Sequence, residues 1–188
     1  YNAPRYTRAF YQPEALFAGY ESGIGINKNF DGFTFDEDRK IWVRKLNMTL
    51  QPVTYIYLPQ IILHNNNRDH RIVTAIDGNA DLSGMSRSVN LNTGVTGPDA
   101  ITVNFNMRMK FDRNGRSNDK VDIIGGKVLT FGIINLNPHK LNTRAYAESM
   151  DKVMAADKNN RHYLDVKMQF YNGKDSTLVF DVTKQVRR

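Results

Sequence analysis

The stretch ITVNFNMRMKFD (residues 101–112) is the clearest indication of the fold class, because apolar and polar residues alternate along its whole length. A β-strand turns successive side chains to opposite faces of its sheet. The residues expected to face a core are Ile101, Val103, Phe105, Met107, Met109 and Phe111. Those expected to face away are Thr102, Asn104, Asn106, Arg108, Lys110 and Asp112. This slightly basic outer face is either a surface for a polyanion or the solvated side of an antiparallel sheet.

The same alternation recurs along the chain from residue 41 onward. YLDVKMQF (163–170) and TLVFDVT (177–183) flank the turn signal Asn172-Gly173 and predict a C-terminal hairpin. Pro59, within YLPQIIL, indicates an edge strand or a bend. Further strands are predicted at KIWVRKLNMTLQP (40–52, with a bulge at Arg44 and Lys45 and an interruption at Gln51-Pro52), VTYIYL (53–58), RIVTAIDG (71–78), VNLN (89–92) and KVDIIGGKVLTFGII (120–134, with a bulge at Gly125-Gly126).

Only one segment has helical spacing. AYAESMDKVMAAD (145–157) places Tyr146, Met150, Val153 and Met154 on one helical face, which predicts a short helix between strands. The rest of this part of the chain is short strands separated by Gly and Asn turns. That pattern predicts an all-β fold, a β-sandwich or barrel with at most one short helix.

The first 40 residues differ in kind from the rest. They contain nine of the twenty aromatic residues, among Gly and Pro and without a strict period. We therefore predict two parts: an aromatic-rich extended segment at residues 1–40, which covers the sandwich or belongs to an upstream domain, and a β-sandwich domain at residues 41–188.

Composition narrows the functional classes. The chain has 188 residues, no cysteine and a net charge of +7. The absence of cysteine excludes disulfides, thiolate metal sites and cysteine nucleophiles. No apolar run approaches the length of a membrane-spanning helix. The first residues contain no signal region, so we expect any targeting segment to have been removed or left out.

No catalytic motif is complete. Gly125-Gly126-Lys127 lacks the spacing of a phosphate-binding loop and continues into a strand, and LSGMS (82–86) lacks the paired glycines of a nucleophile elbow. We interpret LSGMS as a turn between strands. With no catalytic constellation, the sequence predicts a protein that is not an enzyme, without catalytic or cofactor-binding residues and without cofactors.

The sequence also lacks a complete motif for metal or nucleic-acid binding. His64, Asp69 and His70 share one polar loop, but their spacing matches no zinc pattern. DRNGRSNDKVD (112–122) carries oxygen donors, yet its glycine is misplaced for a calcium loop, so a hairpin turn is predicted. The cations are dispersed rather than gathered with aromatic residues. We therefore expect neither a metal nor a nucleic-acid partner.

An ordered set of segments resembles a known family. The segments are QPEALFAGY (12–20), DLSGMSRSVNLNTG (81–94), KVLTFGI (127–133) and YLDVKMQFYNGKDSTLVFDVTKQV (163–186). In this order they resemble the fimbrillin-like surface lipoproteins of gut and oral anaerobic bacteria, and the match spans nearly the whole chain.

The resemblance implies a transthyretin-like Greek-key β-sandwich, an upstream domain with a lipidated cysteine, and a place at the outer membrane on the cell surface. It implies a fimbrial subunit, anchor or adhesin, in which proteolysis, here near Arg5 and Arg8, frees a groove for a strand of a neighbouring subunit. The expected partners are other fimbrial or surface subunits, with membrane contact only through the upstream anchor. The alternative is a glycan-binding module that uses the early aromatic residues.

Overall fold

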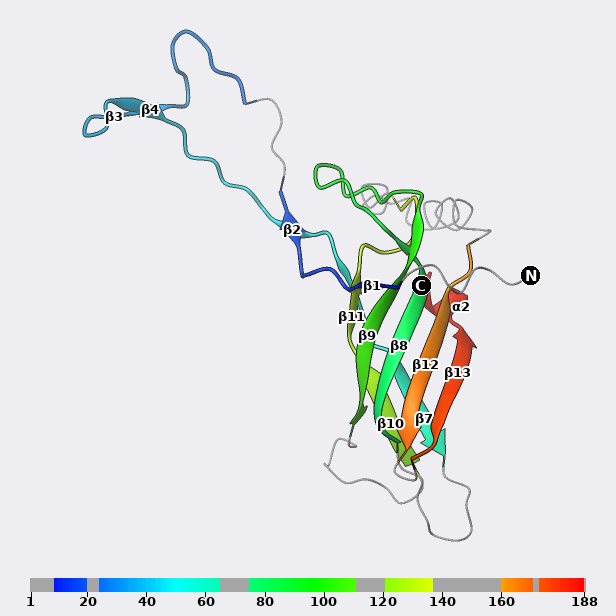
Figure 1. The fold of residues 1–188 in the computed structure, drawn as a ribbon. Helices are drawn as coiled ribbons and strands as arrows, with labels where there is room; N and C mark the ends of the chain where they lie inside the picture. The colour runs from blue at the N-terminus through cyan, green and yellow to red at the C-terminus, as the bar shows by residue number, and fades with distance from the viewer. Residues whose placement is uncertain are drawn as a thin grey trace.

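The computed structural model describes residues 9–19, 24–64, 75–110, 121–136, 160–170 and 173–187 (Figure 1). Within these residues the chain is all-β with one short helix, α2 (Thr183–Val186), so the predicted fold class is confirmed. Outside the described residues lie the helix predicted at 145–157, residues 112–120 of the predicted hairpin turn, residues 71–74 of the strand predicted at 71–78, and Arg5, Arg8, Asp69 and His70. The predicted division into residues 1–40 and 41–188 stays a prediction.

A seven-stranded sheet forms the body of the molecule. Its order is β13 (Asp175–Asp181), β12 (Tyr163–Phe170), β8 (Ala75–Ser86), β9 (Ala100–Lys110), β10 (Val121–Gly126) and β7 (Gln60–His64). Every pairing along this path is antiparallel, and β1 (Ala9–Tyr11) adds a parallel pairing to the start of β9. The predicted C-terminal hairpin is therefore confirmed as β12 and β13.

Three two-stranded sheets complete the described fold. They pair β11 (Val128–Thr130) with β6 (Tyr55–Tyr57), β2 (Phe17–Ala18) with β5 (Gln51–Pro52), and β3 (Thr34–Asp36) with β4 (Ile41–Val43). Figure 1 shows that the chain between β2 and β5 leaves the body and carries β3 and β4 far from it. We call residues 24–50 the arm.

The core lies on the concave face of the curled sheet, where the alternation of β9 predicted it. Val103, Phe105 and Met107 are buried, and Ile101 is partly buried. Arg108 faces solvent as expected, whereas Thr102 is buried although the alternation places it on the polar face. Neighbouring strands supply the other core residues, namely Ala80, Leu82, Met85, Ile124, Val128, Leu164, Val166 and Met168.

Three strand predictions are wrong. The strand predicted at 120–134 divides at Lys127 into β10 and β11, which belong to different sheets. The segment predicted at 40–52 contains only the short β4 and β5, and residues 44–50 belong to no strand, whereas Gln51-Pro52, predicted to interrupt the strand, form β5. VNLN (89–92) is mostly a turn, because the side chain of Asn90 accepts hydrogen bonds from the backbone N–H groups of Asn92 and Thr93. Only an isolated bridge joins Val89 to Thr96.

Two glycine motifs also differ from expectation. Gly125 and Gly126 are not a bulge, because they pair in unbroken register with Arg108 and Met107. A Cβ atom at Gly126 would lie 2.8 Å from the carbonyl oxygen of Asn106, so glycine permits the close approach. LSGMS is not a turn between strands but an irregularity inside β8, where the register shifts between Leu82 and Met85.

Candidate functional site

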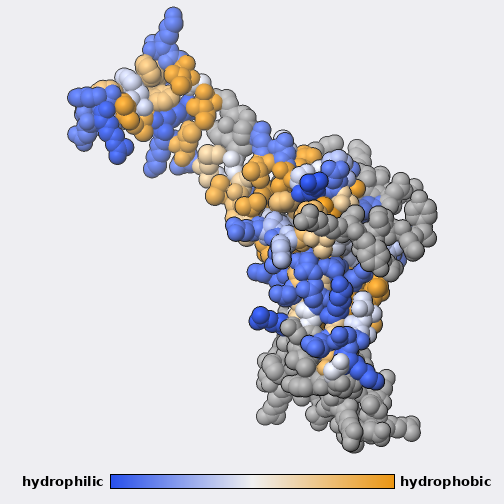
Figure 2. All heavy atoms as spheres, viewed as in Figure 1, coloured by the Kyte–Doolittle hydropathy of each residue, from blue (hydrophilic) through white to orange (hydrophobic). Residues whose placement is uncertain are grey.

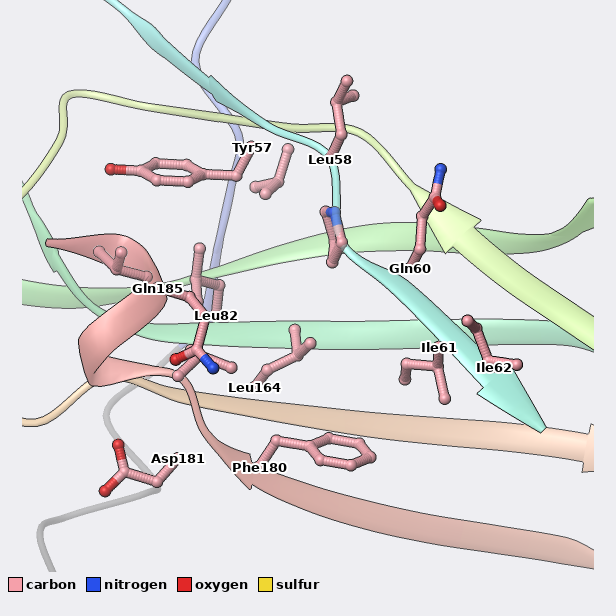
Figure 3. A pocket seen from close by; sticks show the side chains of 14 residues that line it. Tyr57, Leu58, Gln60, Ile61, Ile62, Leu82, Leu164, Phe180, Asp181 and Gln185 are labelled. Carbon is pink, nitrogen blue, oxygen red and sulfur yellow. The ribbon is translucent and has the colours of Figure 1, made fainter. Parts of the chain in front are cut away.

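An apolar groove separates the two ends of the main sheet. β7 and β13 are the terminal strands of the sheet order, and the sheet curls so that both line the same hollow of about 650 Å³. Figure 3 shows Leu82 and Leu164 at its floor, with Ile61 of β7 and Phe180 of β13 on opposite sides. The groove therefore opens directly onto the core.

Both walls of the groove are sheet edges. Within the described part of the chain, β7 pairs only with β10, and β13 pairs only with β12. An edge strand presents backbone N–H and C=O groups that another strand can bind. Pro59 correctly predicted an edge or a bend, since it precedes the edge strand β7. The groove thus combines apolar side chains with two edges capable of strand pairing.

Apolar side chains of the walls remain exposed. Ile62 is 56% exposed and Leu58 is 62% exposed, while Phe180 is 36% exposed. In the terminal hairpin, Leu164, Val166 and Met168 of β12 are buried as predicted, but the apolar face of β13 is only half covered. The cause is geometrical: β12 has neighbours on both sides, whereas β13 ends the sheet.

The end of the groove near α2 carries a carboxylate. Asp181 accepts a hydrogen bond from the backbone N–H of Thr183 at 3.0 Å and lies 3.4 Å from the Arg161 guanidinium. Hydrogen bonding from Thr183 holds the pKa of Asp181 below its ordinary value, and the charge of Arg161 adds to this effect. Asp181 is therefore a partly exposed negative charge beside an apolar surface.

A cluster of aromatic rings lies on the arm. The rings of Phe30 and Trp42 are stacked, with centroids 4.9 Å apart and planes 4° apart. Phe35 is tilted against Trp42, and the Arg44 guanidinium lies 5.8 Å from the centroid of Phe33. Figure 2 shows apolar side chains gathered on this projection. A flat sugar-binding platform needs rings side by side in one plane, whereas Phe30 and Trp42 lie one over the other.

The polar face of β8 and β9 is a network of short side chains. The Asn104 amide donates to the Asp81 carboxylate at 2.6 Å, and the Asn79 amide donates to the Asn104 side-chain oxygen at 3.3 Å. The Lys167 ammonium lies 3.9 Å from Asp81. Amides and an ion pair satisfy one another here, so this face has the character of the solvated side of a sheet and not of a basic stripe.

The motifs Gly125-Gly126-Lys127 and LSGMS have structural roles. Lys127 is exposed between β10 and β11, and the side-chain oxygen of Ser83 accepts a hydrogen bond from the backbone N–H of Tyr163 at 3.0 Å, which links β8 to β12. His162 is fully buried beneath α2.

Among the described residues, no three His, Cys, Asp or Glu side chains gather closely enough to hold a metal ion. That same part of the chain contains no helix with the length and hydropathy to span a membrane.

The sequence did not predict the groove. Phe180 occurs in the same alternating pattern as buried strand residues, and only the curl of the sheet and the position of β13 at its end leave it partly uncovered. Together these features define an all-β module with an open apolar groove between two strand edges. No family model, curated protein or solved structure matches the chain.

Proposed function

We propose that this protein is a non-enzymatic structural or adhesive module of the cell surface, a fimbrial subunit or anchor, and that its groove receives an extended apolar segment of a neighbouring subunit. One observation carries the proposal: β7 and β13 are unpaired edges within the described chain and flank an apolar groove open to the core. A strand inserted there would bind both edges and cover the floor.

The energetics favour such an occupant. Burial of apolar surface contributes about 25 cal/mol per Å². The groove borders a core that includes Leu82, Val128 and Leu164, each at most 5% exposed, so a partner adds to an existing hydrophobic cluster and covers mainly the partly exposed wall residues such as Phe180. Exposed sheet edges favour strand addition, which suits a protein that assembles and disfavours one that acts alone. The resemblance to fimbrillin-like lipoproteins supports the same function and a location at the outer membrane.

A matched pair of substitutions tests the role of the groove. Phe180 lines the groove on the core-facing side of β13 and is 36% exposed, and the neighbouring Val179, on the opposite face of β13, is 41% exposed. We expect Phe180→Lys to abolish native high-mass assemblies extracted from the cell surface, because it places a charge in the apolar groove. Val179→Lys should leave them intact. Equal assembly by both variants, each with an unchanged melting temperature, would contradict the proposal.

A second experiment tests the location. Cells that produce the full-length protein are fractionated, and intact cells are treated with added protease. We expect the protein in the outer-membrane fraction and its removal by the protease. Recovery in the soluble fraction, protected from the protease, would refute the surface assignment whatever the groove binds.

A glycan-binding module is the second candidate. It is favoured by a shallow hollow of about 540 Å³ on the outer sheet face, where amide, hydroxyl and charged side chains converge. Asn106, Lys167 and Gln169 are among them. We rank it second because the stacked rings of the arm do not form a sugar platform. Glycan-array binding that is lost on Asn106→Ala would reverse this order.

A further inference from the structure

We infer that residues 44–50 of the arm are the segment that fills the groove of a second copy of this chain. This inference rests on the proposed function and names the partner of the same site. The chain carries two large apolar surfaces, the groove and the arm, and Figure 1 shows the arm extending away from β7 and β13. A second copy can therefore bring the two surfaces together.

The pattern of residues 44–50 (RKLNMTL) suits a strand that lacks a sheet. Leu46, Met48 and Leu50 alternate with Lys45, Asn47 and Thr49. These three apolar side chains are 42%, 47% and 59% exposed, although their spacing places them on a single face of a strand. The segment therefore has the periodicity of a half-buried strand, although within its own chain the side chains of Met48 and Leu50 lie beside Gly19, next to β2, and stay about half exposed.

The dimensions agree with the groove. Residues 44–50 span about 23 Å at roughly 3.3 Å per residue. The wall strand β13 has the same length of seven residues. In an extended conformation Leu46, Met48 and Leu50 would lie over the buried residues Leu82 and Leu164 and would cover exposed wall residues such as Phe180. Lys45, Asn47 and Thr49 would then face solvent.

Charge sets the direction of insertion. Arg44 is in phase with the three apolar residues and begins the segment, and Asp181 lies at the end of β13 that adjoins α2. Placing Arg44 beside Asp181 makes the inserted segment antiparallel to β13. Since the antiparallel pairings between β13 and β7 leave these two strands running in opposite directions, the segment would be parallel to β7.

The resulting contact is head-to-tail. The surface that donates, the arm, differs from the surface that receives, the groove, so each added copy presents a further arm or groove. Such heterologous contacts build open chains when the rotation between copies does not close. An open chain of copies is the architecture that a fimbrial subunit requires.

Disulfide trapping between two variants tests the inference, because the chain has no cysteine of its own. A mass-tagged Met48→Cys protein is mixed with an untagged Ile61→Cys protein under mild oxidation, since the side chain of Ile61 is on the core-facing side of β7 and lines the groove. We expect a cross-linked product of one tagged and one untagged copy. Ile24→Cys is the matched control for Met48→Cys, since Ile24 is 43% exposed on the arm but lies outside residues 44–50. Its mixture with Ile61→Cys should give little product.

Competition distinguishes specific insertion from chance collision. A synthetic RKLNMTL peptide should suppress the Met48–Ile61 cross-link, whereas a peptide with Leu46, Met48 and Leu50 replaced by Ser should not. No excess of the cross-link over the Ile24 control, with both variants folded, would overturn the inference. If Phe180→Lys still abolishes native assembly in that case, the groove keeps its proposed function and another segment fills it.

Discussion

Phe30 and Trp42 lie stacked at the arm, with ring centroids 4.9 Å apart and planes only 4° from parallel. Trp42 is the single tryptophan of the chain, so intrinsic tryptophan fluorescence reports on the arm alone. The arm contains only the short pair β3 and β4, while the core lies in the body. We therefore expect the arm to unfold before the body.

In a denaturant titration, the fluorescence of Trp42 should change at a lower denaturant concentration than the far-ultraviolet circular dichroism. Phe30→Ala should shift the fluorescence transition further down and leave the transition of the body unchanged, because stacking contributes about 0.5–1.5 kcal/mol beyond area burial. Coincident transitions in the unmodified protein would show that arm and body unfold as one unit.

Gly84 is a site where only glycine fits. Its φ is +83°, and a Cβ atom there would lie 2.7 Å from both the carbonyl oxygen of Arg161 and Nδ1 of His162. We expect Gly84→Ala to lower the free energy of unfolding by about 1–3 kcal/mol, measured by chemical denaturation. Gly25→Ala is the control, because nothing lies within 4 Å of a Cβ at Gly25. Equal stability of the two variants would contradict this packing.

Thr96 joins two loops through one buried hydroxyl. Its Oγ1 donates to the carbonyl oxygen of Ile133 at 2.6 Å and accepts from the backbone N–H of Leu136 at 2.7 Å. Thr96→Val keeps the shape but removes both hydrogen bonds, which should cost about 1–3 kcal/mol of unfolding free energy. Thr177→Val, at an exposed position of β13, should change it by less than about 0.5 kcal/mol.

Asp181 makes stability depend on pH in the acid range. Its pKa is lowered in the folded protein, chiefly by hydrogen bonding from Thr183, so the folded state favours the charged carboxylate. The resulting stability is fully present above the ordinary pKa of 3.8 and is lost as the pH falls through the lower folded value.

Melting temperatures between pH 5 and pH 2 test this dependence. Asp181→Asn should be less stable than the unmodified protein at the upper end of this range, and the difference should shrink towards the lower end. The effect should be small because the side chain is 47% exposed. A difference that grows on acidification would have the wrong sign.

The alternation of side chains predicted the strands that cover the core. It identified β9 and both strands of the C-terminal hairpin, because each has an apolar face toward the core, although at β13 that face is only half covered. The same rule failed at residues 44–50, which have the required alternation but belong to no strand. Alternation specifies an apolar face and says nothing of what covers it.

The groove could not be predicted from the sequence for the same reason, because alternation does not show which apolar faces stay uncovered. Phe180 of β13 and Val166 of β12 follow the same pattern, yet one is 36% exposed and the other is fully buried. The difference arises from the curl of the sheet and the position of β13 at its end, which are properties of the folded chain. LSGMS also shows that the sequence pattern does not specify packing. The pattern predicts that Gly84 is part of a turn, but it lies inside β8, where the lack of a side chain allows close packing against His162.

Amide hydrogen exchange at the two walls of the groove tests whether a neighbouring subunit inserts a strand between β7 and β13. The exchange of backbone N–H groups in β7 and β13 is measured in native assemblies released from the cell surface and in the isolated chain. If a neighbouring subunit inserts a strand, amides of both strands exchange more slowly in the assembly, while those of the turn at residues 91–93 do not change. Identical exchange rates of the β7 and β13 amides in the two samples would contradict the insertion of a strand into the groove.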